Sequence, residues 1–494
     1  MKKNKITTLF VLCLFLFNLG CSTDEASNES QNTTPIISNQ SFTIAENNAI
    51  DAVIGQIVAT DAEGDNLTFS GANSVLSIAP NGQITALTAF DFETTTSHTI
   101  TVTVSDGELS STAIIAVNIT DVQENTRPFI TTWQTTTANE SIFVPTRASE
   151  FTYDYTVDWG DGTIESGVTA NITHTYAAAG TYQVAITGTF PAIFLASPSP
   201  ANSTKIISID QWGDIAWQSM REAFAYCPNL EGQATDVPDL SNVTDMVRMF
   251  QNSVVFNQDI GNWNVSNVTT MKSMFTDADA FNQDIGNWDV SNVTDMENMF
   301  GSADAFNQNI GNWDVGNVTN MIQMFYRNPV FNQDIGNWDV SSVTKMNSMF
   351  EDATAFNQNI GNWNVSSVTD MREMFHRAIA FNQDIGNWDV SSVTDMRLMF
   401  EEAFVFNQNI GNWDVSNVNS MLTMFNGAVS FNQNISTWDV SNVTDMAFMF
   451  RNATNFNQNL TGWSVANVTS CVQFNAGSSG LSDSNRPNFT NCTP

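Results

Sequence analysis

The chain has 494 residues, of which 42% are hydrophobic, and 51 acidic side chains against 16 basic ones give a net charge of −35. This length predicts several domains or one long repeat array, and the hydrophobic content is sufficient for a packed interior. Such an acidic surface repels phosphate backbones, so the composition excludes nucleic acid as a partner.

Residues 1–20 are predicted to be an export signal. Three lysines within residues 1–5 precede an apolar stretch over 6–19, which is too short for a comfortable bilayer span. The stretch ends at Asn18-Leu19-Gly20-Cys21, which resembles the lipobox of bacterial lipoproteins. The resemblance implies acylation of Cys21 and an outer-membrane lipoprotein on the bacterial surface, attached to the membrane by its lipid anchor alone. The alternative is an ordinary cleaved signal.

Two cysteines near the C-terminus are candidates for a disulfide. Export permits disulfides, so Cys471 and Cys492 could form one, whereas the alternative is that both, with Cys227, are buried thiols. The chain has no Cys-x-x-Cys pair, so a structural zinc site is not supported.

Residues 21–35 are polar and are predicted to form a flexible tether. Over residues 36–127, short β-branched runs alternate with Gly, Asn and Asp turns, which predicts an antiparallel β-sandwich. Its acidic segments, such as Asp61-Ala62-Glu63-Gly64-Asp65 and Asp91-Phe92-Glu93, resemble those of cadherin-like domains. The resemblance implies a joint Ca²⁺ site formed by Glu46, Asp61, Glu63, Asp65, Asp91, Glu93 and Asp121. The alternative is a set of Asx turns on a solvated rim.

Residues 128–200 are predicted to form a second all-β sandwich. The run Asp158-Trp159-Gly160-Asp161-Gly162 and the later Tyr/Val alternation resemble a PKD-type domain. Asp158 and Asp161 are interpreted as residues that stabilise turns rather than as metal ligands.

Residues 205–475 contain the strongest pattern in the chain. Tryptophan recurs every 25 residues from Trp263 to Trp463, and eighteen of the twenty methionines belong to nine Met-x-x-Met pairs. Nine copies at one period predict a solenoid whose coils stack like residues into Met, Phe and Trp rows. The atypical repeats at both ends are interpreted as caps, with residues 476–494 as the C-terminal cap and tail.

The spacing within one copy predicts a helix. Val293, Met296, Met299 and Phe300 share one helical face, and an extended stretch with a break at Gly311 follows. A helix plus a short strand in 25 residues predicts an α/β leucine-rich-repeat-like solenoid, with a parallel β-helix as the alternative.

The repeat motif M-F…FNQDIGNWDVSNVT resembles that of BspA-like leucine-rich-repeat surface proteins. The resemblance implies a cell-surface adhesion protein that binds an extracellular host or matrix protein or a polysaccharide. Copies within this chain differ mainly between the methionines and after the following phenylalanine, which predicts a variable face exposed to solvent. The candidate binding residues on it are Arg248, Lys272, Tyr326, Arg327 and Arg372. The alternative is neutral drift on an idle face.

Three function classes follow from this organisation. A binding protein, with the two β-domains as a stalk that Ca²⁺ could stiffen, is favoured over a structural protein that self-associates. An enzyme, such as a carbohydrate-active one, is least favoured, because His98, His174 and His376 fall in separate segments without a nucleophile or metal motif. No catalytic residue is therefore predicted, and Ca²⁺ is the one cofactor considered.

Overall fold

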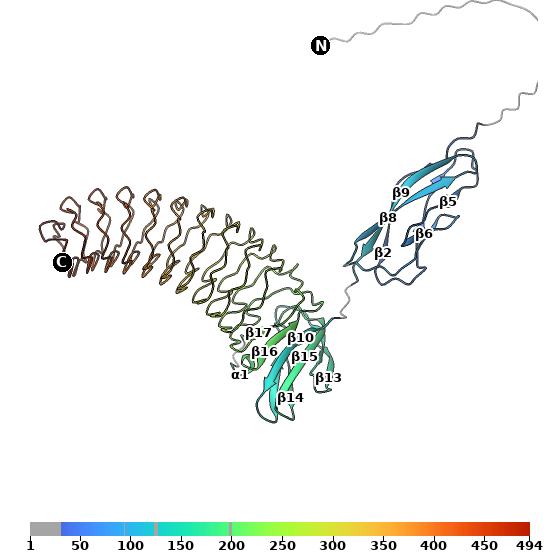
Figure 1. Cartoon of the computed structure of the whole chain (residues 1–494), viewed down its shortest axis with the longest axis horizontal. Helices are drawn as coiled ribbons and strands as arrows, with labels where there is room; N and C mark the ends of the chain where they lie inside the picture. Colours follow the sequence, from blue (N-terminus) through green and yellow to red (C-terminus); the bar gives the residue numbers. More distant parts are fainter. Residues whose placement is uncertain (1–30, 93, 123–126, 197–199) are drawn as a thin grey trace, which may run out of the picture. The chain divides into compact units, whose positions relative to one another are not determined.

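The computed structural model describes residues 31–92, 94–122, 127–196 and 200–494, and the chain divides into two compact units, residues 1–123 and 124–494 (Figure 1). Cys21, the predicted lipidation site, lies outside the described residues. In the described part of the chain, no helix is long and apolar enough to cross a membrane.

The N-terminal unit is built from short strands in two main sheets. One sheet has the order β2-β9-β8-β5, the second β3-β7-β6, and β1 pairs with β4. Alternate residues of β8 and β9, among them Val102, Val104, Ile115 and Val117, are buried in a core between the sheets. The strands are β1 (Ile36–Ile37), β2 (Gln40–Ala45), β3 (Val53–Gln56), β4 (Ala59–Thr60), β5 (Thr68–Ser70), β6 (Leu76–Ile78), β7 (Gln83–Ala86), β8 (Ser97–Ser105) and β9 (Ser110–Thr120).

The second unit begins with a six-stranded sheet of order β13-β12-β15-β10-β16-β17 and a two-stranded sheet, β11-β14. Asp158 and Asp161 accept backbone N–H groups of Gly160 and Thr163, as expected for residues that stabilise turns. The elements are β10 (Phe129–Thr135), β11 (Glu140–Val144), β12 (Asp154–Asp158), β13 (Ile164–Val168), β14 (Ile172–Tyr176), β15 (Gly180–Thr189), α1 (Pro200–Ser203), β16 (Ile206–Gln211) and β17 (Glu231–Gly232).

The six-stranded sheet continues into the repeats. Strand β16 pairs with β10 on one side and, in parallel, with β17 of the first coil on the other. One continuous apolar core therefore runs from Phe129 in the sheet to Leu481 beyond the last coil. The sheet closes the end of the core that the first coil would otherwise leave open to water.

The 25-residue copies form a row of stacked coils (Figure 1). Successive coils meet at isolated parallel bridges, one per coil, from Asp245↔Thr270 to Asp445↔Ser470. In a representative coil, the N–H groups of Met296, Asn298, Phe300 and Ser302 donate to carbonyls of the next coil at 2.7–3.0 Å. The intervening N–H groups of Met299, Gly301 and Ala303 close turns onto the third residue before them.

The predicted helix over the Met-x-x-Met segment is wrong. Asn298 and Ser302 have φ values of 55° and 52°, in the left-handed region, and this segment is a series of turns. In a helix, the N–H groups would donate to carbonyls of the same segment. Here every second N–H donates to a carbonyl of the neighbouring coil. The described residues contain only one helix, α1, of four residues. The described part of the chain is therefore all-β apart from this single turn of helix, and the predicted α/β leucine-rich-repeat solenoid is not formed.

Aromatic rows fill the interior of the coils. Phe300 stacks on Phe306 of its own coil at 3.9 Å between ring centroids, and on Phe325 of the next coil at 5.9 Å. The indoles are 3–5% exposed in every copy, and Trp363 Nε1 donates to the carbonyl of Ile335 at 3.1 Å. The tryptophans are therefore core residues and cannot serve as an exposed sugar-binding platform.

Polar side chains complete the backbone hydrogen bonding at the coil edge. Asn332 Oδ1 accepts the N–H of Asn357, and Gln358 Nε2 donates to the carbonyl of Asn332 at 2.9 Å. At the C-terminal end, Cys471 and Cys492 are joined in a disulfide, which holds the tail against the last coil.

The left-handed turn residues provide a test of the coil geometry. Thr423 has φ 54°, which is strained for a β-branched residue, whereas Asn298 at the same position of another coil is a type that tolerates this region. We expect Thr423→Asn to raise the free energy of unfolding by up to about 1 kcal/mol, measured by urea denaturation. Thr454→Asn, at a residue outside the left-handed region, is the control and should give no gain. A loss of stability in Thr423→Asn would contradict this geometry.

Candidate functional site

The carboxylates predicted to bind Ca²⁺ together are divided between the two ends of the N-terminal unit. Glu46 accepts the N–H of Val122, just after the end of strand β9. Glu63 accepts the hydroxyl of Thr33 at the other end of the unit. Pro35, two residues after Thr33, accepts the hydroxyl of Ser111 near the start of β9. The length of β9 separates these ends by ~30 Å. The six of these carboxylates that the structure describes therefore do not come together in one joint site.

Glu46 has a structural role at its end of the unit. Its side chain is 4% exposed, Oε2 accepts the N–H of Phe92 at 2.8 Å, and Oε1 accepts the N–H of Val122 at 2.7 Å. Asp91 lies beside this contact and accepts the Thr94 hydroxyl, Asp121 is exposed, and Glu93 lies outside the described residues. Glu46 thus ties two loops together through their backbones.

At the opposite end, Asp61 forms an Asx-type turn. Its Oδ1 accepts the N–H groups of Glu63 and Asp65, while its Oδ2 is buried without a hydrogen-bond partner. Across the described residues, no group of three or more His, Cys, Asp or Glu side chains is arranged to hold a metal ion. The turn interpretation therefore accounts for this segment, and a calcium centre does not follow from it.

Three sets of outward side chains in each coil form the variable face. They lie at the two positions between the methionines, at the residue before the first methionine that forms the parallel bridge to the next coil, and at the two positions after the phenylalanine that follows the second methionine. All five candidate binding residues lie on it, and so do all the basic residues between 245 and 470. These basic residues are Arg248, Lys272, Arg327, Lys345, Arg372, Arg377, Arg397 and Arg451. The other outward rows of the coils contain acids and amides but no Lys or Arg.

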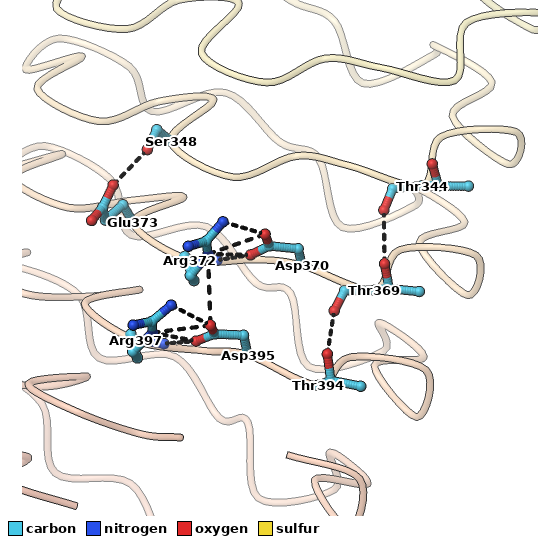
Figure 2. Close-up of polar contacts among 9 residues, drawn as sticks. All are labelled: Thr344, Ser348, Thr369, Asp370, Arg372, Glu373, Thr394, Asp395 and Arg397. Atoms are coloured by element: carbon cyan, nitrogen blue, oxygen red, sulfur yellow. Dashed lines mark hydrogen bonds and ion pairs between the residues drawn. The ribbon is translucent and has the colours of Figure 1, made fainter. Parts of the chain in front are cut away.

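Ion pairs cross from coil to coil on the variable face. Arg372 binds Asp370 of its own coil at 2.7 Å and reaches Asp395 of the next coil at 3.6 Å, and Arg397 binds Asp395 at 2.7 Å. Figure 2 shows this series beside the Ser348–Glu373 hydrogen bond and a row of threonines. Each Arg remains more than a third exposed, so a partner can reach these guanidinium groups.

The other candidate residues belong to similar series. Arg248 pairs with Glu222 at 3.2 Å and Lys272 with Glu297 at 2.9 Å. Arg327 lies against the ring of Tyr326, 5.0 Å from its centroid, and reaches Asp352 at 3.8 Å. The structure thus places all five on one face but spreads them over several coils, in place of one compact pocket.

The acidic partners of these cations were not predicted from the sequence. In one column, 25 residues apart, Arg327, Asp352, Arg377 and Glu402 alternate in sign, and Arg377 binds Asp352 at 3.0 Å. The signal for this pairing was present in the sequence, because equivalent positions of consecutive coils stack. Reading each column for alternating charge would have found it.

A histidine lies between two glutamates in the neighbouring column. His376 Nδ1 is 3.3 Å from Glu351 Oε1, and its Nε2 is 3.7 Å from Glu401 Oε2. Burial opposes protonation, but the bond to Glu351 and the charge of Glu401 outweigh it and raise the pKa of His376 above its ordinary value. Burial also raises the pKa of Glu401, while the contacts with His376 and Ser348 outweigh burial and lower that of Glu351.

Exposed apolar side chains accompany the charges. Ile379, Phe404 and Val405 are each about 40% exposed on consecutive coils, two or three residues after the variable positions. They add exposed apolar area to the coils that also present arginines.

Comparison with known protein families separates the two units. The family model described as Mycoplasma protein of unknown function, DUF285, matches residues 218–333, 305–404 and 382–484. The model described as Bacterial Ig domain matches residues 32–120. Residues 32–120 of the N-terminal unit therefore form an Ig-like domain.

Individual proteins match over short stretches. Mouse cadherin-related family member 2 is 36% identical over 104 residues, which are 20% of this chain and 8% of that protein. A structure of human protocadherin-24 EC1-2 matches at 24% identity and TM-score 0.17, over 18% of this chain and 45% of that one. Drosophila N-cadherin EC1-4 matches at 17% identity and TM-score 0.20, over 31% and 48%. The chain thus spans less than a tenth of the mouse relative and less than half of these two structures.

The contacts of Glu46 lead to a prediction that separates a structural role from metal ligation. Glu46→Ala removes a buried charged acceptor of two partly buried N–H groups, so we expect a loss of about 1.5–3 kcal/mol in the unfolding free energy of the N-terminal unit. Differential calorimetry should detect the same loss with Ca²⁺ and with chelator. Glu108→Ala, at an exposed acid of the same unit, is the control. A loss that occurs only with Ca²⁺ would instead make Glu46 a calcium ligand.

The raised pKa of His376 predicts the sign of a pH dependence. Folding favours the protonated ring, so this contribution is complete below the unfolded value of about 6.5 and is lost as pH rises through the folded value. We expect His376→Gln to reduce the loss of stability between about pH 6 and pH 8. Tryptophan fluorescence reports the second unit alone, since all thirteen Trp lie there. An unchanged pH dependence in His376→Gln, compared with His98→Gln as control, would contradict the prediction.

Proposed function

Since the chain belongs to the family described as Mycoplasma protein of unknown function, DUF285, whose description assigns no activity, we propose a function from the surface of its repeats: the variable face binds an extracellular protein. The observation that carries this proposal is the restriction of every Lys and Arg between 245 and 470 to that one face. Nine coils at ~4.8 Å each extend it over ~45 Å, a length suited to many weak contacts.

The chemistry of the face favours a protein over a simple polyelectrolyte. In the column of Arg327 and Arg377 the arginines alternate with acids, so both signs are presented there in a defined order, and Phe404 and Ile379 add exposed apolar area to the same coils. Arginine and aromatic residues are enriched at the centres of protein interfaces. Along that column, a uniformly charged polysaccharide would meet like charge on every second coil.

The rest of the chain fits display outside the cell. The Ig-like and cadherin-like unit is an extracellular module type, the BspA-like repeat motif is typical of surface adhesion proteins, and the lipobox-like motif supports an acyl anchor at Cys21. In this proposal the N-terminal unit is a spacer without a resident calcium ion, and the protein binds its partner without chemical transformation. The alternative is a structural role through self-association.

Replacing two arginines by the asparagine that another coil carries at the same position tests the binding face. The double variant Arg372→Asn with Arg397→Asn has asparagine at both positions. Asn347 already occupies the equivalent position of another coil, so the coils should tolerate the change. Against the best ligand in a panel of purified matrix proteins, we expect about tenfold or more weaker binding, measured by surface plasmon resonance.

The matched control lies on another row of the same coils. In the double variant Asp334→Asn with Asp384→Asn, each new asparagine can accept the N–H of the glycine two residues later, as Asn359 does from Gly361. This variant should leave the affinity unchanged. If affinity followed net charge alone, the two double variants would shift it in opposite directions. Equal binding by both would overturn the assignment of the face. No ligand in the panel, with concentration-dependent self-association in sedimentation, would favour the structural alternative.

A further inference from the structure

A polar cleft lies where the six-stranded sheet meets the first coil, away from the variable face. Its volume is about 610 Å³, and its floor is the outer face of strands β15, β10, β16 and β17, which are neighbours in the sheet (Figure 1). Asn229, Gln233 and Val255 of the first coils form its wall. The feature follows from the fusion of sheet and repeats, since neither part alone has both floor and wall.

The floor of the cleft contains a straight row of polar residues. Thr132 on β10 is opposite Gln183 on β15 and opposite Ser208 on β16, and Ser208 is opposite Glu231 on β17. Neighbouring strands lie ~4.8 Å apart, so the row presents a polar group at each step over ~14 Å. A linear chain that crosses the strands would meet these groups in succession.

Several of the polar groups are free to bind. In the described part of the chain, the side chains of Gln134, Gln183 and Gln233 make no hydrogen bond, and neither does that of Glu231. Asp210, by contrast, is held by the hydroxyls of Thr132 and Ser208, the latter at 2.7 Å. The cleft therefore offers three amides and one carboxylate around a fixed acidic centre.

The type of side chain selects the type of ligand. An amide both donates and accepts hydrogen bonds, as a sugar hydroxyl does, so amides match polyhydroxylated ligands. None of the residues lining the cleft is Lys, Arg or His, and two of them are the acids Asp210 and Glu231, so an anionic ligand would find amide and hydroxyl donors but no positive charge and two like charges. Ile207 and Val255 supply apolar contact of the kind that the C–H faces of a sugar ring can cover.

We propose that this cleft binds a neutral glycan chain laid across strands β15, β10, β16 and β17. The site is separate from the variable face, so the protein carries two recognition surfaces: the coils bind a protein, and the end of the sheet binds polysaccharide. The two proposals rest on different residues and stand or fall independently.

Affinity gel electrophoresis of the full chain tests the cleft. The probes are three neutral soluble polysaccharides, a β-glucan, a mannan and a galactomannan, with polygalacturonate as the anionic comparison. We expect at least one neutral probe to retard the protein, and polygalacturonate not to do so. Gln134→Ala with Gln183→Ala should weaken the retarding interaction at least tenfold, and Gln233→Ala from the wall should weaken it separately.

The control repeats the same chemical change outside the cleft. Gln218→Ala with Gln473→Ala alters two exposed glutamines that do not line it, and should bind as the unmodified chain does. The variable-face variant, Arg372→Asn with Arg397→Asn, should also keep its glycan binding, which separates this proposal from the proposed function. Absence of retardation by all three neutral probes, or unchanged binding by both sets of cleft variants, would overturn the proposal.

Discussion

The stack of coils depends on hydrogen bonds between the backbones of successive copies. Every second N–H along the Met-x-x-Met segment donates to the next coil, and the intervening ones close turns within their own coil. Each coil therefore presents its neighbour with a row of donors and acceptors that must match in position. A one-residue insertion within this segment would shift its donors out of register with the next coil and leave buried polar groups unpaired, at a cost of several kcal/mol. This constraint accounts for the unbroken 25-residue period and for the repeated inward side chains.

The same constraint determines where function can develop. Inward positions must stack, and the Asn and Gln rows are required to pair coil edges, so variation is confined to the outward positions of the turns. Charges placed there stack at the same interval, which is why Arg377 meets Asp352 and His376 meets Glu351 from adjacent coils. The ends of the stack are closed differently, by the six-stranded sheet on one side and by the disulfide-linked tail on the other. The proposed glycan cleft is a consequence of the first of these closures.

The wrong prediction of a helix has a specific cause. Met296, Met299, Phe300 and Ala303 are all buried, at positions i, i+3, i+4 and i+7, and this spacing is the one expected from a helix. Consecutive turns with a left-handed residue at every fourth position produce the same spacing. Apolar periodicity reports which side chains face inward, but it does not report where the backbone N–H groups donate. In this chain they donate to another coil, which a single copy of the repeat cannot reveal.

The sequence by itself determined the repeat period, the residues of the core, the face that varies, and the candidate cysteine pair at the C-terminal end. These features depend on spacing along the chain, and equivalent residues of a regular array meet at that same spacing. Only the tertiary structure decided that the predicted calcium carboxylates lie at opposite ends of one unit, and that Gln183, Thr132, Ser208 and Glu231 share a row. Both depend on strand order and register, because a sheet brings together residues whose separation in sequence follows no period.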